Sequence, residues 1–314
     1  MKLSLERSLD GQRGHNNFMR ALVESLQRDH SVTLVGRKDK SDIHLSVVAG
    51  HKDGSKNILR LDGVYYDVGR LSKNTSIAKS LSQSDGVVFQ SEWSKKFVTG
   101  MLRIAPRQSV SIWNGVNQSV IRSASPVPIG KYEKWWVSCA HWRVNKRAEA
   151  IADAFLLARK QVPFSVGFCF IGGMQSPDFM RKNKTLLYLG EVPHDRLFSI
   201  LKSTSWMCHI CHVDSCPNSV IEGLSAGLPV LSNNIGGTPE IVGASGTIVP
   251  VDRPFSFKPI ASMQDVGSSS VDVSLLAQSM VQMMNGRWSI NRPDLDISVT
   301  ARRYYEFFQK ILRT

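Results

Sequence analysis

Short apolar runs alternate with segments of helical periodicity along most of this chain. The runs are typical of strands, because a few apolar or β-branched residues stand between turn-forming ones, while the intervening segments repeat apolar residues every three or four positions. In the first part of the chain the expected strands are 3–5, 31–35, 43–48, 57–61, 86–90 and 109–113, and the expected helices are about 15–28, 74–84 and 91–103. This alternation predicts βαβ units around a parallel sheet, the α/β class.

A second series of the same kind follows residues 114–133, which are rich in Asn, Ser, Pro and Gly and lack a clear period. Its expected strands are 135–140, 164–172, 185–190, 205–210, 229–233 and 246–250, and its expected helices are 144–160, 195–203, 217–226, 272–285 and 296–312. The sequence therefore predicts two Rossmann-like, doubly wound domains, residues 1–125 and 126–295. Ligands of such sheets bind at the carboxyl ends of the strands, so we expect a site in the cleft between the domains.

Composition narrows the class of protein. The chain has 314 residues, 42% of them hydrophobic and 21% charged, which excludes collagen, coiled coils, small disulfide scaffolds and wholesale disorder. No apolar run approaches the ~20 residues that span a bilayer, and we see no signal peptide. Five cysteines, an odd number, favour reduced thiols and a cytoplasmic protein.

The net charge of +13 is concentrated in the first 125 residues, where 19 Lys and Arg stand against 11 Asp and Glu, or +8. Such a surface suits an anionic partner such as a phospholipid surface, a phosphorylated acceptor or nucleic acid. Charge alone does not choose among them. We expect no nucleic acid, and we expect that the protein can lie at the periphery of an anionic membrane.

The segment from His209 to Gly243 is the most informative one. Asp214 and Glu222 have seven residues between them, and a helix is expected to start near Pro217, where the first turn tolerates proline. Asn218 and Ser219 then stand at a helix N-terminus, whose free N–H groups bind anions.

A second turn of similar character follows, with Gly236 and Gly237 just before Pro239. Glycine lets the backbone approach a ligand closely. Two helix starts with a carboxylate nearby suit a ligand that carries a diphosphate and sugar hydroxyls.

These residues, with the strand GLSAGLPV and the turn IGGTPE, resemble the retaining GT-B glycosyltransferases, in particular family 4 of the glycosyltransferases. The family has two acidic residues with seven between them, and Asp214 stands here in place of its first Glu. The resemblance implies that Asp214 lies near the transferred sugar, that Glu222 binds the ribose hydroxyls of the donor, and that Gly236 and Gly237 lie near the sugar or diphosphate.

Weaker matches to the family extend over most of the chain. They imply that Gly14 in GQRGHNNF meets the donor or acceptor, that Lys146 and Arg143 in CAHWRVNKR bind the donor phosphates, and that the backbone near Val192 in GEVPHDRL contacts the base. Strict spacing puts His141 at the family's Arg position. WNGVN (113–117) matches an element before the linker. The family's last helix crosses back to the first domain, as we expect for residues 296–314, and its Tyr304, Tyr305, Phe307 and Phe308 are expected to pack in a core.

The first domain departs more from the family on the acceptor side. Asp62, just past a strand end, is the candidate to orient or deprotonate the acceptor hydroxyl, with His44 and His51 as other candidates. A turn-forming Asp-Gly is an equally good interpretation of Asp62.

The cysteine-rich stretch offers residues that could bind two other groups, haem and zinc. Cys208, Cys211 and His212 match a haem-attachment pattern, and with Cys216 they are also zinc ligands by type. The plainer interpretation is that these cysteines are small buried residues. We expect no metal site.

The sequence thus predicts a metal-independent, retaining glycosyltransferase with no obligatory cofactor. Its donor is a nucleotide-diphosphate sugar, and its acceptor is a hydroxyl of a glycan, a lipid-linked glycan or a similar molecule. Two alternatives stay open: another GT-B enzyme, such as an epimerase or phosphorylase, and a catalytically degenerate basic binding module.

Overall fold

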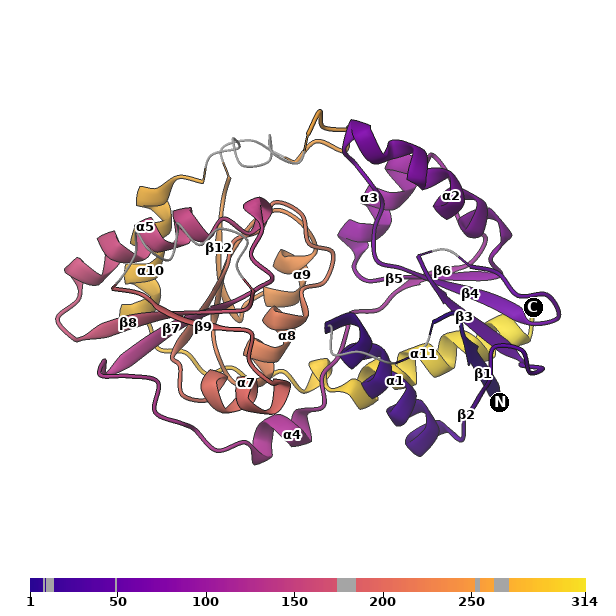
Figure 1. Ribbon diagram of the computed structural model, residues 1–314, viewed down its shortest axis with the longest axis horizontal. Coiled ribbons are helices and arrows are strands. Elements are labelled where there is room, and N and C mark those ends of the chain that lie inside the picture. Colours follow the sequence, from indigo (N-terminus) through magenta and orange to yellow (C-terminus); the bar gives the residue numbers. More distant parts are fainter. Residues whose placement is uncertain (8, 10–13, 49, 174–184, 252–254, 263–270) are drawn as a thin grey trace. The chain divides into compact units, whose positions relative to one another are not determined.

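The computed structural model describes residues 1–7, 9, 14–48, 50–173, 185–251, 255–262 and 271–314. The chain forms two compact units (Figure 1). Unit 1 comprises Met1–Asn117, Ser256–Ser262 and Asp294–Thr314, and unit 2 comprises Gln118–Phe255 and Met263–Pro293. Among the helices in the described ranges, none has both the length and the apolar character to cross a bilayer.

The first unit is built on a parallel sheet of six strands in the order β2-β1-β3-β4-β5-β6. The order reverses between β1 and β3, as in doubly wound folds. The strands are β1 (Lys2–Leu5), β2 (Thr33–Val35), β3 (Ile43–Val47), β4 (Lys56–Leu61), β5 (Gly86–Phe89) and β6 (Ser109–Ser111). The helices are α1 (Gly14–His30), the 3-10 helix η1 (Val68–Lys73), α2 (Asn74–Gln83), α3 (Glu92–Leu102) and α11 (Ile297–Leu312).

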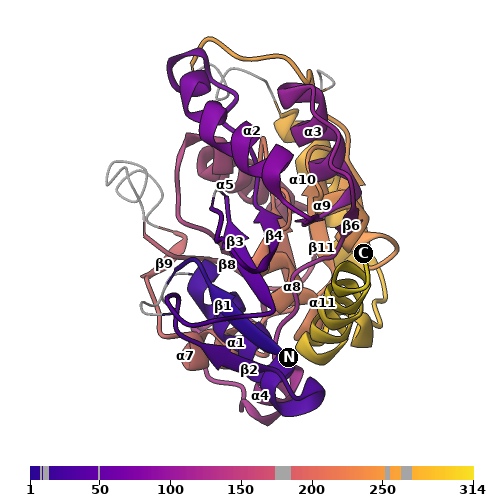
Figure 2. The same ribbon diagram turned by 90° about the vertical axis from the view of Figure 1, so that its right-hand side faces the viewer.

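The last helix of the chain belongs to the first unit. α11 runs beside α1 in both views (Figure 1 and Figure 2). Tyr304, Phe307 and Phe308 of α11 are buried in one core with Leu22 and Leu26 of α1. The prediction that these three aromatic residues pack in a core is confirmed, because the strong amphipathic period of the helix leaves one face to bury.

A short segment from late in the chain also belongs to the first unit. Residues 256–262 are joined to the first unit by a parallel bridge between Asp67 and Ile260. The ring of Phe257 lies 6.2 Å from the ring of Trp93 on α3. No local sequence pattern indicates this excursion, since it is set by contacts with residues far away in the chain.

The second unit has its own parallel sheet of six strands, in the order β12-β11-β10-β7-β8-β9. The order reverses between β7 and β10, the Rossmann arrangement. The strands are β7 (Lys134–Cys139), β8 (Val166–Ile171), β9 (Leu187–Gly190), β10 (Trp206–His209), β11 (Val230–Asn233) and β12 (Gly246–Val249).

The helices of this unit pack around the sheet (Figure 1). They are α4 (Gln118–Ser123), η2 (Val144–Lys146), α5 (Ala148–Ala158), η3 (Arg159–Gln161), α7 (His194–Leu201), α8 (Asn218–Ser225), α9 (Thr238–Val242) and α10 (Val273–Asn285). A short 3-10 helix, η5 (Pro293–Leu295), precedes α11. The two doubly wound parallel sheets confirm the predicted α/β class.

The helix predicted over 144–160 is broken in the structure. Val144–Lys146 form a 3-10 turn, and Arg147 adopts a left-handed conformation (φ 52°) before α5 begins at Ala148. An L-residue reaches this conformation only at a cost. The break lets Lys146 point away from the helix and toward the loop that carries Asp214. Hydrophobic periodicity does not predict such a contact, because it relates only residues close together in the sequence.

The predicted linker is also not wholly irregular. Residues 118–123 form α4, whose buried Gln118 donates a hydrogen bond of 2.7 Å to the backbone oxygen of Arg292. Ile121 is buried on the same helix. Tertiary contacts therefore order a short helix that local propensity alone would leave marginal.

A buried polar network joins β1 and β3. His44 is fully buried, and its Nδ1 lies 2.9 Å from the hydroxyl of Ser4, which in turn lies 2.8 Å from the hydroxyl of Ser41. Burial, together with the charges of Lys52 and Arg37, lowers the pKa of His44 to about 4. The position of His44 inside the sheet removes it from the acceptor candidates, since a side chain without solvent access cannot meet a substrate hydroxyl.

We expect this histidine to make the protein acid-sensitive. The unfolded chain takes up the proton near pH 6.5 and the folded chain only near pH 4, so the stabilisation is full above pH 6.5 and is lost as pH falls toward 4. A depression of this size corresponds to about 3 kcal/mol. Urea unfolding of the wild type and His44→Gln from pH 7 to pH 4 measures this, and equal pH dependence of both proteins would contradict it.

Candidate active site

Lys146 and Asp214 meet where the strand order of the second sheet reverses. Lys146 ends the 3-10 turn after β7, and Asp214 lies in the loop after β10, the neighbouring strand. Lys146 Nζ donates to Asp214 Oδ2 at 2.6 Å, and only 18% and 19% of the two side chains are exposed. The crevice outside the carboxyl ends of the strands at such a reversal is where doubly wound folds bind ligands.

The charges of this pair stabilise each other. Burial by itself would lower the pKa of Lys146 and raise that of Asp214, but their mutual attraction, with the added effects of Cys211 on the lysine and His209 on the aspartate, outweighs burial in both cases. The pKa of Lys146 is therefore raised and that of Asp214 is lowered. An ammonium that is held in place and largely shielded from water is an effective counter-charge for an anionic ligand or leaving group.

His209, the last residue of β10, is a further member of the site. Its Nε2 lies 3.7 Å from Asp214 Oδ2, and its side chain is 4% exposed. Burial lowers the pKa of His209; the Asp214 carboxylate opposes this effect and the Lys146 ammonium adds to it. No sequence motif singles out His209, and its place at a strand end is the signal by which it could have been found.

Hydrogen bonds join three loops next to the Lys146–Asp214 pair. The side chain of Asn233, at the end of β11, accepts from Cys211 N at 3.1 Å and donates to Cys211 O at 2.9 Å. The backbone oxygen of Asn145 accepts from His212 N at 3.0 Å. The loops after β7, β10 and β11 are thus held as one assembly, which fixes the position of Asp214.

The Gly236–Gly237 turn packs directly on Asp214. The backbone oxygen of Asp214 accepts a hydrogen bond of 2.9 Å from Gly237 N. Gly236 has a φ of +87°, and a Cβ atom there would lie 2.4 Å from the same oxygen. Both the conformation and the close approach therefore require glycine.

Glu222 lies one turn into α8 and is paired with His194. His194 Nε2 lies 2.7 Å from Glu222 Oε1, with 40% of the histidine and 13% of the glutamate side chain exposed. The hydrogen bond to Glu222 raises the pKa of His194. The sequence singled out the segment around Val192 but not His194 itself, the first residue of α7.

The remaining predicted donor residues are spread around the same edge. Asn218 and Ser219 begin α8, with Pro217 as its N-cap rather than in its first turn. Val192 lies in the loop between β9 and α7. Arg143 is exposed, and within the described part of the chain it has no ion pair. Lys146, not Arg143, is thus the residue that the fold brings to Asp214.

The first unit carries the other two candidates. Asp62 follows β4 and is paired with the buried Arg60, and Gln90 donates to Asp62 Oδ1 at 2.5 Å. Arg60 also donates to Asn114 at 2.8 Å. Asp62 is thus part of a network rather than only a turn residue. Gly14 begins α1, while residues 11–13 of its predicted loop lie outside the described residues.

One group in the described ranges has the geometry to hold a metal ion. Ligand atoms of His209, Cys211 and Asp214 lie within 4.8 Å of one another. Nitrogen, sulfur and oxygen donors suit Zn²⁺, but the ion would compete with the Lys146 ammonium for Asp214. Cys208 of the haem pattern lies in the hydrophobic core of the unit, and all five cysteines are buried.

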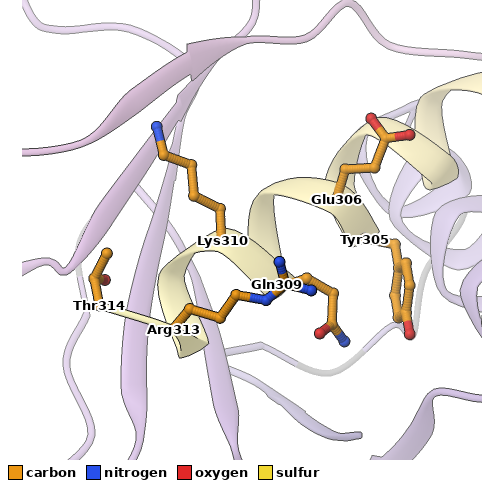
Figure 3. A pocket seen from close by; sticks show the side chains of 6 residues that line it. All are labelled: Tyr305, Glu306, Gln309, Lys310, Arg313 and Thr314. Atoms are coloured by element: carbon orange, nitrogen blue, oxygen red, sulfur yellow. The ribbon is translucent and has the colours of Figure 1, made fainter.

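A surface depression on the last helix is unrelated to these residues. Figure 3 shows its six side chains, which come from the C-terminal part of α11 and the residues after it. None of the candidate site residues lines it. We therefore assign it no part in the chemistry.

Comparison with known proteins finds a matching family. Residues 134–258 match the family described as "Glycosyl transferases group 1", and the matched segment contains Lys146, Asp214, Glu222 and the Gly236–Gly237 turn. No curated protein sequence matches the chain. The predicted resemblance to this family is thus confirmed, and residues 134–255 of the matched segment lie in the second unit.

Solved structures define the class of fold. HepE of Anabaena, solved in complex with UDP-glucose, is 12% identical, with 98% of this chain and 99% of that chain covered and a TM-score of 0.62. WaaG, a glycosyltransferase involved in lipopolysaccharide biosynthesis, is 12% identical, with 99% and 98% covered and a TM-score of 0.63. At this identity the likeness shows the fold alone, and it confirms the predicted GT-B class.

A third structure is longer than this chain. The match to the GtfA/B complex covers 86% of this chain and 58% of that chain, at 11% identity and a TM-score of 0.57. The chain therefore spans 58% of the length of that relative, and what the whole of that protein does is not carried over.

Proposed function

We propose that this protein is a retaining glycosyltransferase that moves a sugar from a nucleotide-diphosphate sugar to a hydroxyl of a glycan or lipid-linked acceptor. One observation carries the proposal: the Lys146–Asp214 pair stands at the reversal point of the second sheet, against the Gly236–Gly237 turn, inside the segment that matches the family. A buried cation, a carboxylate and two nearby helix starts suit a diphosphate and a sugar.

In this proposal the residues have separate roles. The Lys146 ammonium, with the amides at the start of α8, stabilises the departing diphosphate, where negative charge develops. Asp214 lies beside the transferred sugar, Glu222 receives the ribose hydroxyls, and Arg143 adds a second, exposed charge toward the phosphates. Asp62 orients the acceptor hydroxyl, and the leaving phosphate takes its proton.

We also propose that the reaction needs no metal ion, since Lys146 already supplies the counter-charge. Turnover that survives a chelator supports this, and loss of turnover restored by a divalent cation contradicts it. The excess of basic residues in the first 125 positions supports an acceptor at an anionic membrane. Co-sedimentation with anionic but not neutral vesicles tests that part.

Thermal stabilisation by UDP-, GDP-, ADP- and dTDP-sugars tests the donor site, with UDP-glucose first because HepE binds it. A ligand that binds only the folded protein raises its stability by about 2.7 kcal/mol at a hundredfold excess over Kd. We expect one base to stabilise the wild type and Glu222→Ala to abolish most of that shift.

Product analysis then separates the alternatives. Free nucleoside diphosphate with a new glycoside supports transfer, whereas an isomerised nucleotide sugar indicates an epimerase and release by phosphate indicates a phosphorylase. If no nucleotide sugar stabilises the protein and only salt-dependent vesicle binding is seen, the protein is a basic binding module and the proposal is wrong.

A further inference from the structure

The contact between His194 and Glu222 joins two helices at the edge of the donor site. His194 is the first residue of α7, and Glu222 lies within α8. The distance of 2.7 Å between His194 Nε2 and Glu222 Oε1 is that of a charge-assisted hydrogen bond. The histidine ring also packs on Phe198 one turn along, with 4.6 Å between ring centroids.

Neither helix needs this pair to stay in place. α8 is anchored by the buried side chains of Val220, Ile221 and Leu224, and α7 by those of Leu197 and Leu201 among others. An ion pair whose histidine is 40% exposed contributes little to stability. The main effect of the contact is therefore on the glutamate side chain itself, which it holds in one orientation.

A fixed carboxylate matters for what Glu222 binds. A free glutamate loses rotamer entropy when it receives a ligand, and a glutamate already held by a neighbour has lost that entropy beforehand. Bonding at Oε1 also leaves the orientation of both carboxylate oxygens defined for two adjacent hydroxyls. The smaller entropy cost strengthens the binding only of ligands whose hydroxyls contact Glu222.

We propose that His194 is a positioning residue that orients Glu222 toward the ribose of the donor and so sets the discrimination between ribonucleotides and 2′-deoxyribonucleotides. This inference rests on the proposed function, because Glu222 is the ribose-binding residue only if the second unit binds a nucleotide sugar.

Calorimetric titration with UDP, GDP and ADP, each beside its 2′-deoxy counterpart, tests the proposal. His194→Phe keeps the packing on Phe198 and removes the hydrogen bond. We expect it to weaken the ribonucleotide about tenfold, the scale of one hydrogen bond to a charged group, and the 2′-deoxy form much less. His194→Gln, whose amide can replace Nε2, should restore the wild-type ratio of the two affinities.

Two controls make the result specific. In a Glu222→Ala background His194→Phe should have no further effect, since the two residues act through one contact. His30→Phe is the matched variant, because His30 also stacks on an aromatic ring, that of Tyr305 in the first unit, and should leave nucleotide affinity unchanged.

The outcomes separate the two proposals. If the wild type binds a ribonucleotide but His194→Phe keeps its ribo-to-deoxy ratio, or weakens both forms equally, this inference is wrong and the proposed function stands. If the wild type binds none of the three nucleotides, this inference is wrong. The proposed function fails with it only if no nucleotide sugar of the panel, the dTDP-sugars included, stabilises the protein.

Discussion

Replacement of Lys146 by alanine is expected to lower kcat by roughly 10²–10³-fold, the scale for losing one preorganised electrostatic contact. The ammonium lies 2.6 Å from Asp214 with its pKa raised, so its charge is present and in place before any ligand arrives. Initial rates at saturating donor and acceptor measure the effect. Lys202→Ala, which removes a half-buried lysine of the same unit that donates to a backbone oxygen, is the matched control and should leave kcat unchanged.

Loss of folding must be separated from loss of chemistry in this experiment. Without Lys146 the largely buried Asp214 carboxylate has lost its cation, and an uncompensated charge of this kind destabilises a protein strongly. The double variant Lys146→Ala/Asp214→Asn removes both charges, so we expect it to regain stability and to remain inactive. A folded Lys146→Ala protein with kcat within threefold of the wild type would rule out the assigned role.

Substitution of Gly236 by alanine is expected to lower kcat by about 10²-fold, the effect of displacing a catalytic group by about 1 Å. The added methyl would lie 2.4 Å from the backbone oxygen of Asp214, so the loop that carries Asp214 must move. The positive φ adds strain of about 1–3 kcal/mol. Steady-state kinetics and thermal unfolding of the variant give the two effects.

Gly227→Ala is the control that isolates the contact from the strain. Gly227 has nearly the same φ, +89°, but an added Cβ there meets no atom within 4 Å. We expect it to lose some stability and to keep its activity. Equal loss of activity in both variants would mean that backbone strain, and not displacement of Asp214, causes the defect.

In the first unit the sequence predicted that Asp62 follows a strand end, but it did not indicate which residue pairs with it. Arg60 is one residue before the end of β4, directly after the apolar Ile58 and Leu59, and its side chain is almost fully buried. It reaches Asp62 and also Asn114, from the loop after β6. An arginine within a strand predicts a nearby counter-charge, but the identity of that partner depends on how neighbouring strands are aligned.

Much of the candidate site could be predicted because its determinants are local. Asp214, Glu222 and the Gly236–Gly237 turn lie within one segment, and a helix start or a glycine turn is determined by residues a few positions away. The same is true of the strands and most helices, whose alternation defined the two doubly wound sheets.

What the sequence by itself determined about this protein is thus its fold class, the alternation of its strands with most of its helices, and the acidic and glycine residues of its candidate site. Only the tertiary structure decided that Lys146 pairs with Asp214 and that His194 pairs with Glu222. The physical reason is the parallel sheet: its alignment brings the carboxyl ends of β7 and β10 together, although periodicity relates only residues within a few turns of one another.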